Sequence, residues 1–93
     1  MNVITRNQLD TLLTSPPPTY FFLDVRERSE FAEYSIGGVN IPPHEIGDHL
    51  DELKKYHDIV VFCSNGMRSS LVLRWLLKKN PDAVYWHLEE GIW

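Results

Sequence analysis

The sequence lacks the features of a disulfide-stabilised, membrane-spanning or nucleic-acid-binding protein. It has one cysteine in 93 residues, so no internal disulfide can form, and a reducing cytoplasm is the expected location. No apolar run is long enough for a membrane span or for the apolar part of a signal peptide. The net charge is −4 and no dense run of Lys and Arg occurs, which argues against nucleic acids and anionic membranes as partners. The length suits one small domain with a single modest core.

Short apolar segments rich in aromatic and β-branched residues predict buried strands. Three stand out, at residues 20–23, 59–62 and 83–86, and two shorter candidates lie at 39–41 and 2–4. Helical patterns separate them. Apolar strands that alternate with helices predict an α/β fold, with a mostly parallel sheet flanked by helices on both faces.

Two helices have clear start or stop signals. Thr5 is expected to cap a helix that carries three leucines and ends at the triple proline 16–18, which we interpret as a surface connector. The segment 69–79 is apolar around much of its circumference and ends at Asn80-Pro81, so it predicts a mostly buried helix. The three tryptophans are expected to be core aromatics.

The only cysteine opens a polar segment between a predicted strand and a predicted helix: Cys63-Ser64-Asn65-Gly66-Met67-Arg68-Ser69. A chain that turns from strand to helix points backbone N–H groups inward and adds the positive end of the helix dipole. Such surroundings lower a thiol pKa from about 8.5 to roughly 3.5–7.5. Gly66 permits the tight turn, and Arg68 would supply a forked cation for an anionic substrate. An inert buried cysteine is the competing interpretation, but this context favours a nucleophile.

A second polar cluster, Asp24-Val25-Arg26-Glu27, follows the strand at 20–23. Because ligands bind at the carboxyl ends of parallel strands, this cluster and the cysteine loop are expected to share one rim. We interpret Asp24 and Arg26 as supporting residues with mainly structural roles. Asp24 is expected to cap the helix that follows, and Arg26 either pairs with a carboxylate or adds positive potential.

The histidines do not predict a metal site. His44 and His49 are five residues apart and so miss the i, i+4 spacing that places two ligands on one helical face. We interpret all four histidines, including His57 and His87, as surface or rim residues.

Four segments, in this order and at this spacing, resemble a single-domain rhodanese over nearly the whole chain: residues 22–27, 38–42, 63–69 and 90–93. The resemblance implies a five-stranded parallel sheet flanked by helices and a rhodanese-type sulfurtransferase activity, with no metal or organic cofactor. In that family the residue matching Cys63 takes sulfane sulfur from a donor such as thiosulfate or a persulfide. The resulting persulfide would be cradled by the loop amides from Ser64 to Ser69 and passed to a thiol or cyanide acceptor, including a partner protein's cysteine.

The sequence departs from the rhodanese pattern in two places. Many relatives carry Gly-His-Ile where this chain has Tyr34-Ser35-Ile36, so a usual packing histidine is missing. Relatives typically continue into a closing helix, whereas this sequence stops at Trp93. We therefore expect one domain over residues 1–93 that lacks the closing helix and exposes apolar surface around Trp93.

Two alternatives belong to other functional classes. Rhodanese-like folds also serve as non-catalytic interaction modules, although the presence of Cys63 counts against this role. A related arrangement serves cell-cycle phosphatases and certain arsenate reductases, in which a longer loop cups a tetrahedral oxyanion. Here Phe62 occupies the position where tyrosine phosphatases carry histidine, and four residues separate Cys63 from Arg68. This tighter loop suits one sulfur atom better than a phosphate.

Overall fold

Five parallel strands form a single sheet in the computed structural model, which describes all 93 residues. The order is β1-β5-β4-β2-β3, so β4 lies at the centre. The strands are β1 Asn2–Val3, β2 Tyr20–Asp24, β3 Val39–Asn40, β4 Asp58–Phe62 and β5 Val84–His87. The predicted α/β fold and its parallel sheet are confirmed.

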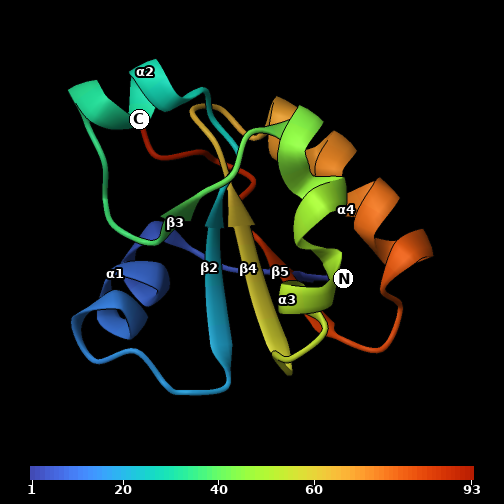
Figure 1. Ribbon diagram of the computed structural model, residues 1–93. Helices are drawn as coiled ribbons and strands as arrows, with labels where there is room; N and C mark the ends of the chain where they lie inside the picture. Colours follow the sequence, from blue (N-terminus) through green and yellow to red (C-terminus); the bar gives the residue numbers. More distant parts are fainter.

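Helices cover both faces of the sheet (Figure 1). One side carries α1; the other carries the 3₁₀ helix η1, α3 and α4. The bounds are α1 Arg6–Thr14, α2 Arg28–Glu33, η1 Pro43–His49, α3 Leu50–Leu53 and α4 Met67–Lys79. None of these helices has the length and apolar character required to cross a bilayer.

The cap predicted at Thr5 is present. The Thr5 hydroxyl accepts a hydrogen bond from the Gln8 amide at 3.1 Å, and the Gln8 side chain accepts one from the Thr5 amide at 2.9 Å. This reciprocal pair satisfies two N–H groups that the first helical turn leaves free. Helix α1 ends at Thr14, just before the triple proline, as the sequence predicts.

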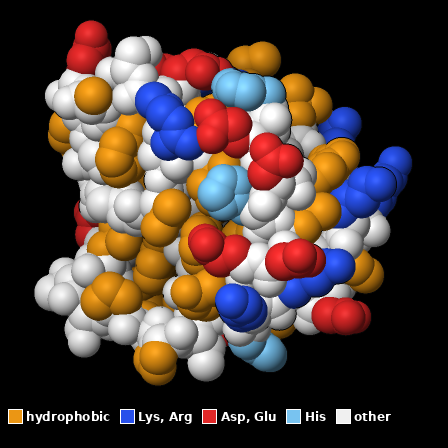
Figure 2. Space-filling model, viewed as in Figure 1, with side chains coloured by type: hydrophobic (Ala, Val, Ile, Leu, Met, Phe, Trp, Pro, Cys, Tyr) orange, Lys and Arg blue, Asp and Glu red, His pale blue; other side chains and the backbone are white.

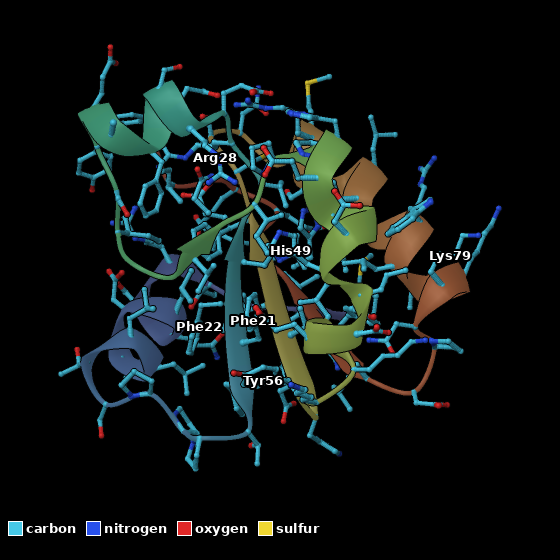
Figure 3. All side chains as sticks on the ribbon, in the orientation of Figure 1. Phe21, Phe22, Arg28, His49, Tyr56 and Lys79 are labelled. Atoms are coloured by element: carbon cyan, nitrogen blue, oxygen red, sulfur yellow. The ribbon has the colours of Figure 1, made fainter.

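The continuous apolar strands reflect a sheet that is covered on both faces. Phe21 belongs to the larger core cluster, under η1, α3 and α4, while its neighbour Phe22 belongs to the smaller one under α1. Figure 3 labels both rings together with Tyr56, whose ring centroid lies 5.0 Å from that of Phe21. Successive strand residues point to opposite faces, so each strand contributes to both clusters.

Helix α4 differs from the prediction in its start and its burial. It begins at Met67, two residues before the expected start at Ser69, because Gly66 turns the chain with a φ of +87°. Only one of its faces is buried, and Leu71 is 65% exposed. The predicted mostly buried helix is therefore wrong, because α4 packs on the sheet through one face although its apolar residues surround the axis.

None of the three tryptophans is fully buried, so the core positions expected for Trp75 and Trp86 are only partly correct. Trp75 is 37% exposed, and Trp86 is half-buried with its indole N–H donating to Asp58 at 3.0 Å. Trp93 is 76% exposed, as expected, and its ring centroid lies 4.8 Å from that of Tyr34. Amphipathic aromatics can rest on a neighbour while one side faces water.

Charged side chains of both signs are interspersed on the face drawn in Figure 2. No continuous basic surface is visible on that face, which agrees with the net charge of −4. The distribution gives no support to nucleic-acid binding on this side of the molecule.

Candidate active site

The two polar clusters meet at one rim of the sheet. Asp24 at the end of β2 lies opposite Phe62 at the end of β4, and the Val25 amide donates to the Phe62 carbonyl at 3.0 Å. The segments after these strands therefore leave the sheet side by side, as the sequence predicts. This places the Cys63 loop next to the segment that leads into α2.

Two backbone amides and one hydroxyl surround the Cys63 sulfur. Its Sγ lies 3.2 Å from the Gly66 amide nitrogen, 3.4 Å from the Ser69 amide nitrogen and 3.3 Å from Ser69 Oγ. Cys63 itself is fully buried. A loop that turns directly into α4 thus aims two backbone amides and one hydroxyl at a single sulfur atom.

These contacts favour the thiolate. Burial raises the pKa of Cys63, but the hydrogen bonds from the Ser69 side chain and from the loop amides outweigh it, so the pKa is lowered from its ordinary value. The direction agrees with the sequence-based prediction, since donors to the charged form of a thiol favour that form.

Two glycines hold the loop against the segment that follows β5. Gly66 has a φ of +87°, and a side-chain Cβ there would lie 2.2 Å from the Glu89 carbonyl oxygen. Gly91 has a φ of +76°, and its Cβ would lie 2.1 Å from the Ser64 carbonyl oxygen. The Ile92 amide donates to the Cys63 carbonyl at 3.1 Å. The final segment is therefore part of the wall of the site.

Arg68, which the sequence predicts as a cation for an anionic substrate, is paired with a carboxylate in the structure. Its two terminal nitrogens bind the two carboxylate oxygens of Glu30 at 2.6 and 3.0 Å, and one also donates to Ser64 Oγ at 3.2 Å. The hydrogen bond from Arg68 is the main cause that lowers the pKa of Glu30 to about 2. Sequence reasoning missed Glu30 because it is 38 residues away and only the fold brings α2 to the loop.

Asp24 and Arg26 form a buried ion pair behind the rim. The Arg26 guanidinium and the Asp24 carboxylate lie 2.9 Å apart, and both side chains are at most 1% exposed. Asp24 also accepts from the Arg26 amide at 2.9 Å. Asp24 is thus not the cap of α2, which is Glu27; its acceptor capacity is used by Arg26. Of the two roles predicted for Arg26, pairing with a carboxylate is the one observed.

His87 lies at the rim of the site, as the sequence analysis allows, but it is buried and contacts the cysteine loop, which the sequence analysis did not predict. It is 4% exposed, and its Nε2 lies 2.7 Å from Ser69 Oγ. His44 and His57 are exposed, as expected. The position of His87 at the carboxyl end of β5 could have predicted its proximity to the cysteine loop. Strand β5 pairs with β4, and parallel strands end at the same edge of the sheet.

The remaining loop residues lie at the mouth of the site. The Asn65 side chain accepts from the Met67 amide at 3.1 Å, and Met67 is 71% exposed. A shallow depression of about 430 Å³ adjoins the loop, with Asn65, Met67, Leu71, His87 and Glu89 among its lining residues. Ligand-sized space is therefore present beside the cysteine loop.

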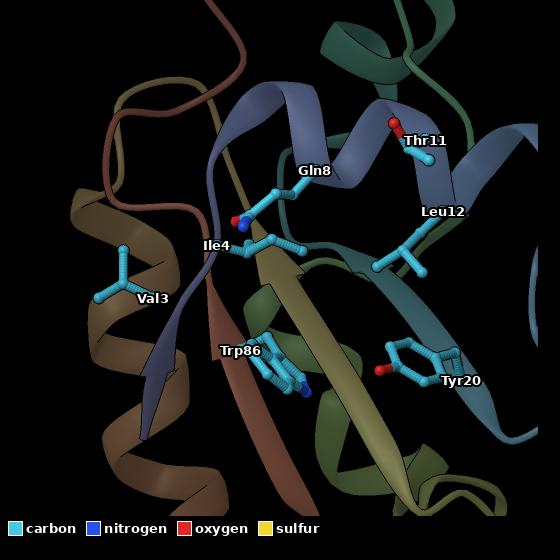
Figure 4. A pocket seen from close by; sticks show the side chains of 7 residues that line it. All are labelled: Val3, Ile4, Gln8, Thr11, Leu12, Tyr20 and Trp86. Carbon is cyan, nitrogen blue, oxygen red and sulfur yellow. The ribbon is translucent and has the colours of Figure 1, made fainter.

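A second depression, of about 390 Å³, has no residue of the cysteine loop in its lining (Figure 4). It is mainly apolar and is lined by Val3, Ile4, Gln8, Thr11, Leu12, Tyr20 and Trp86. It contains no cysteine, histidine or carboxylate that would provide chemistry. No group of three or more His, Cys, Asp or Glu side chains is arranged to hold a metal ion.

Comparison with protein families shows to which family the chain belongs. Residues 5–92 match the family described as the Rhodanese-like domain. The chain belongs to the rhodanese-like domain family. The resemblance drawn from the sequence is thereby confirmed. No curated protein matches the chain.

Solved structures share the rhodanese-like fold. A rhodanese-like domain protein from Staphylococcus aureus is 28% identical, with a TM-score of 0.78, and the match covers 99% of this chain and 88% of that one. A thiosulfate sulfurtransferase from Pseudomonas aeruginosa is 22% identical, with a TM-score of 0.83 and 99% of this chain covered. A Rhodopseudomonas palustris protein described as a possible tyrosine phosphatase is 17% identical, with a TM-score of 0.83 and coverage of 98% and 76%.

The last two likenesses concern the fold alone. Two of the matched proteins are also much longer than this rhodanese-like domain, which spans 16% of one and 18% of the other. Family and fold are therefore established, and the reaction must be argued from the residues around Cys63.

Proposed function

We propose that this rhodanese-like domain is a sulfurtransferase that carries sulfane sulfur on Cys63. The observation that carries the proposal is the polar ring around one sulfur atom: the Gly66 and Ser69 amides donate to Sγ, and the Ser69 hydroxyl lies 3.3 Å from it. Preorganised donors of this kind stabilise negative charge on sulfur. Membership of the rhodanese-like family supports the same chemistry.

The reaction has two covalent half-reactions. The Cys63 thiolate attacks the outer sulfur of thiosulfate; a new S–S bond forms, the old one breaks, and sulfite leaves with the electron pair. A persulfide donor would release a thiolate in the same way. In the second half, cyanide or a thiolate attacks the outer sulfur of the Cys63 persulfide, and the Cys63 thiolate leaves. No metal or organic cofactor is needed.

The loop from Ser64 to Ser69 would surround the persulfide. Gly66 and Ser69 supply the donors described above, while Asn65 and the exposed Met67 form the mouth. Arg68 braces the loop to Glu30 through Ser64 and contributes its positive charge beside Cys63. The buried pair of Asp24 and Arg26 supports the rim from behind.

Sulfur transfer fits this loop better than phosphate-ester hydrolysis. A phosphate needs donors for several oxygens, and the guanidinium of Arg68 is occupied by both oxygens of Glu30. Only four residues separate Cys63 from Arg68, which leaves a cradle suited to one sulfur. The fold shared with a possible tyrosine phosphatase makes hydrolysis the alternative that the experiment must address.

The donor and acceptor we propose are small sulfur compounds or a partner protein's cysteine. Because Cys63 is fully buried, loading requires the exposed residues at the mouth to move aside. Transfer also requires a reduced thiol, so we place the reaction in a reducing compartment such as the cytoplasm.

The test is intact mass spectrometry of the protein after incubation with thiosulfate or with a thiol persulfide. We expect one added sulfur on the wild type, none on Cys63→Ala, and loss of the added sulfur when cyanide is supplied. Thiocyanate formation then measures turnover.

Two results would contradict the proposal. Failure of every donor to load a folded wild type would favour a non-catalytic interaction module. Cys63-dependent hydrolysis of aryl phosphates, without sulfur loading, would assign the site to the phosphatase class.

A further inference from the structure

His87 completes a chain of close contacts that begins at the nucleophile. Cys63 Sγ lies 3.3 Å from Ser69 Oγ, and Ser69 Oγ lies 2.7 Å from His87 Nε2. All three residues are at least 96% buried. Cys63 directly follows β4, Ser69 lies in the first turn of α4, and His87 ends β5.

The single hydrogen of the Ser69 hydroxyl limits which hydrogen bonds can form between Cys63, Ser69 and His87. A hydroxyl donates one hydrogen and accepts two. Ser69 Oγ contacts Cys63 Sγ, His87 Nε2 and, at 3.2 Å, the Gly66 carbonyl. That carbonyl already accepts from the Ser70 amide at 3.1 Å. The Ser69 hydrogen can therefore point to His87 or to Cys63 without leaving the carbonyl unsatisfied.

Two protonation states fit the same heavy-atom positions. In the first, the Cys63 thiol donates to Ser69, and the Ser69 hydroxyl donates to a neutral His87. In the second, an imidazolium at His87 donates to Ser69, and the Ser69 hydroxyl donates to the Cys63 thiolate. The two states interconvert when one proton leaves sulfur for oxygen and another leaves oxygen for nitrogen.

We propose that His87, acting through Ser69, takes up the Cys63 thiol proton and so generates the nucleophilic thiolate. His87 acts as the proton acceptor for Cys63 through Ser69, and this role requires no contact with the substrate. The inference adds a base to the sulfur transfer proposed above and rests on the same nucleophile. It does not depend on which sulfur donor the protein uses.

The surroundings of His87 suit a neutral base. Burial lowers the pKa of His87, while Glu89 and a hydrogen bond to the Gly66 backbone partly oppose this, so the imidazole is unprotonated and able to accept near neutral pH. Its register partners on β1 and β4, Val3 and Val61, are apolar. Once protonated, the imidazolium would face the Glu89 carboxylate on one side and the Cys63 thiolate, through Ser69, on the other.

The test measures the thiolate directly and needs no sulfur donor. The ultraviolet absorbance of the thiolate is followed against pH and corrected with Cys63→Ala. We expect His87→Gln and Ser69→Ala each to raise the thiol pKa by about one unit, which means about tenfold less thiolate near neutral pH. Ser69→Thr keeps the hydroxyl and should restore the wild-type titration. His44→Gln, at an exposed histidine, is the matched control and should change nothing.

The double variant separates a relay from two independent structural effects. If His87 acts through Ser69, His87→Gln should add nothing to Ser69→Ala, because the path is already broken. Additive effects in the double variant would overturn the proposal, as would a wild-type titration in a folded His87→Gln. These titrations do not measure sulfur loading. The proton relay and the sulfurtransferase assignment can therefore fail separately.

A second measurement covers the case in which the His87 variants do not fold. Nuclear magnetic resonance of the His87 ring protons reports its pKa in the wild type and in Cys63→Ala. The relay predicts that removal of the thiol changes the His87 titration, since the two groups share a proton. Identical titrations in the two proteins would refute it.

Discussion

Replacement of Gly91 by alanine tests whether the final segment fixes the cysteine loop. Gly91 has a φ of +76°, and an added Cβ would lie 2.1 Å from the Ser64 carbonyl oxygen and 2.5 Å from the Asn65 Cα. Both neighbours are backbone atoms of the cysteine loop, so no flexible side chain can move aside. The variant must either shift the loop or displace the final segment.

The expected loss of stability has two parts. A left-handed conformation costs an alanine about 1–2 kcal/mol, and forcing extra volume into a packed site costs about 1–3 kcal/mol more. We therefore expect Gly91→Ala to lower the free energy of unfolding by about 2–5 kcal/mol. For a domain of this size each kcal/mol corresponds to about 4–8 °C in melting temperature.

The assay is urea unfolding of Gly91→Ala beside a matched glycine variant. Gly47 has no positive φ, and its nearest atom to an added Cβ is a Trp75 ring carbon at 3.9 Å, so Gly47→Ala should change the stability by less than about 0.5 kcal/mol. The Cys63 thiolate fraction should also fall in Gly91→Ala, because Ser64 and Asn65 follow Cys63 directly. A Gly91→Ala protein as stable as Gly47→Ala, with an unchanged thiolate fraction, would refute the reasoning.

Two further predictions concern the ion pairs around the site. Because the pKa of Glu30 is lowered from 4.5 to about 2 in the folded protein, its contribution to stability is complete above pH 4.5 and is lost as the pH falls toward 2. Urea unfolding should show Glu30→Gln less stable than wild type by about 1 kcal/mol or less at neutral pH, with a difference that shrinks in acid; a constant difference would contradict this. Arg26→Ala leaves the Asp24 carboxylate buried without its partner and should lower the free energy of unfolding by about 3–5 kcal/mol. The control Arg74→Ala, at an exposed residue, should lower it by less than about 0.5 kcal/mol. Equal losses of stability in the two variants would show that the buried pair is not critical.

The secondary structure was largely predictable because its signals are local. The strand segments are short and apolar on both faces, Thr5 is followed by Gln8 in the spacing of a capping box, and the triple proline ends α1. Helix burial was not predictable in this way. The apolar residues of α4 surround its axis, and only packing on the sheet determined that Val72 and Leu76 are buried while Leu71 is exposed.

Within the candidate site, the sequence determined the candidate nucleophile, Cys63, and its loop. A lone cysteine followed by Gly66 and by a helix start predicts inward-facing amides, because backbone geometry at a strand-to-helix turn depends on neighbouring residues alone. The family resemblance rested on the same local segments, and the match over residues 5–92 confirms it.

Tertiary structure decided which partners these residues have. Glu30 occupies the guanidinium of Arg68, Arg26 occupies Asp24, and His87 reaches Ser69. Glu30 lies 38 positions from Arg68, and His87 lies 18 positions from Ser69. The sequence allowed Asp24 either to cap a helix or to pair with a nearby cation. A sequence states which groups can donate, accept or carry charge, but side chains distant along the chain meet only when the strand order brings their elements together. Local sequence therefore determined the candidate nucleophile, and the fold determined its electrostatic environment.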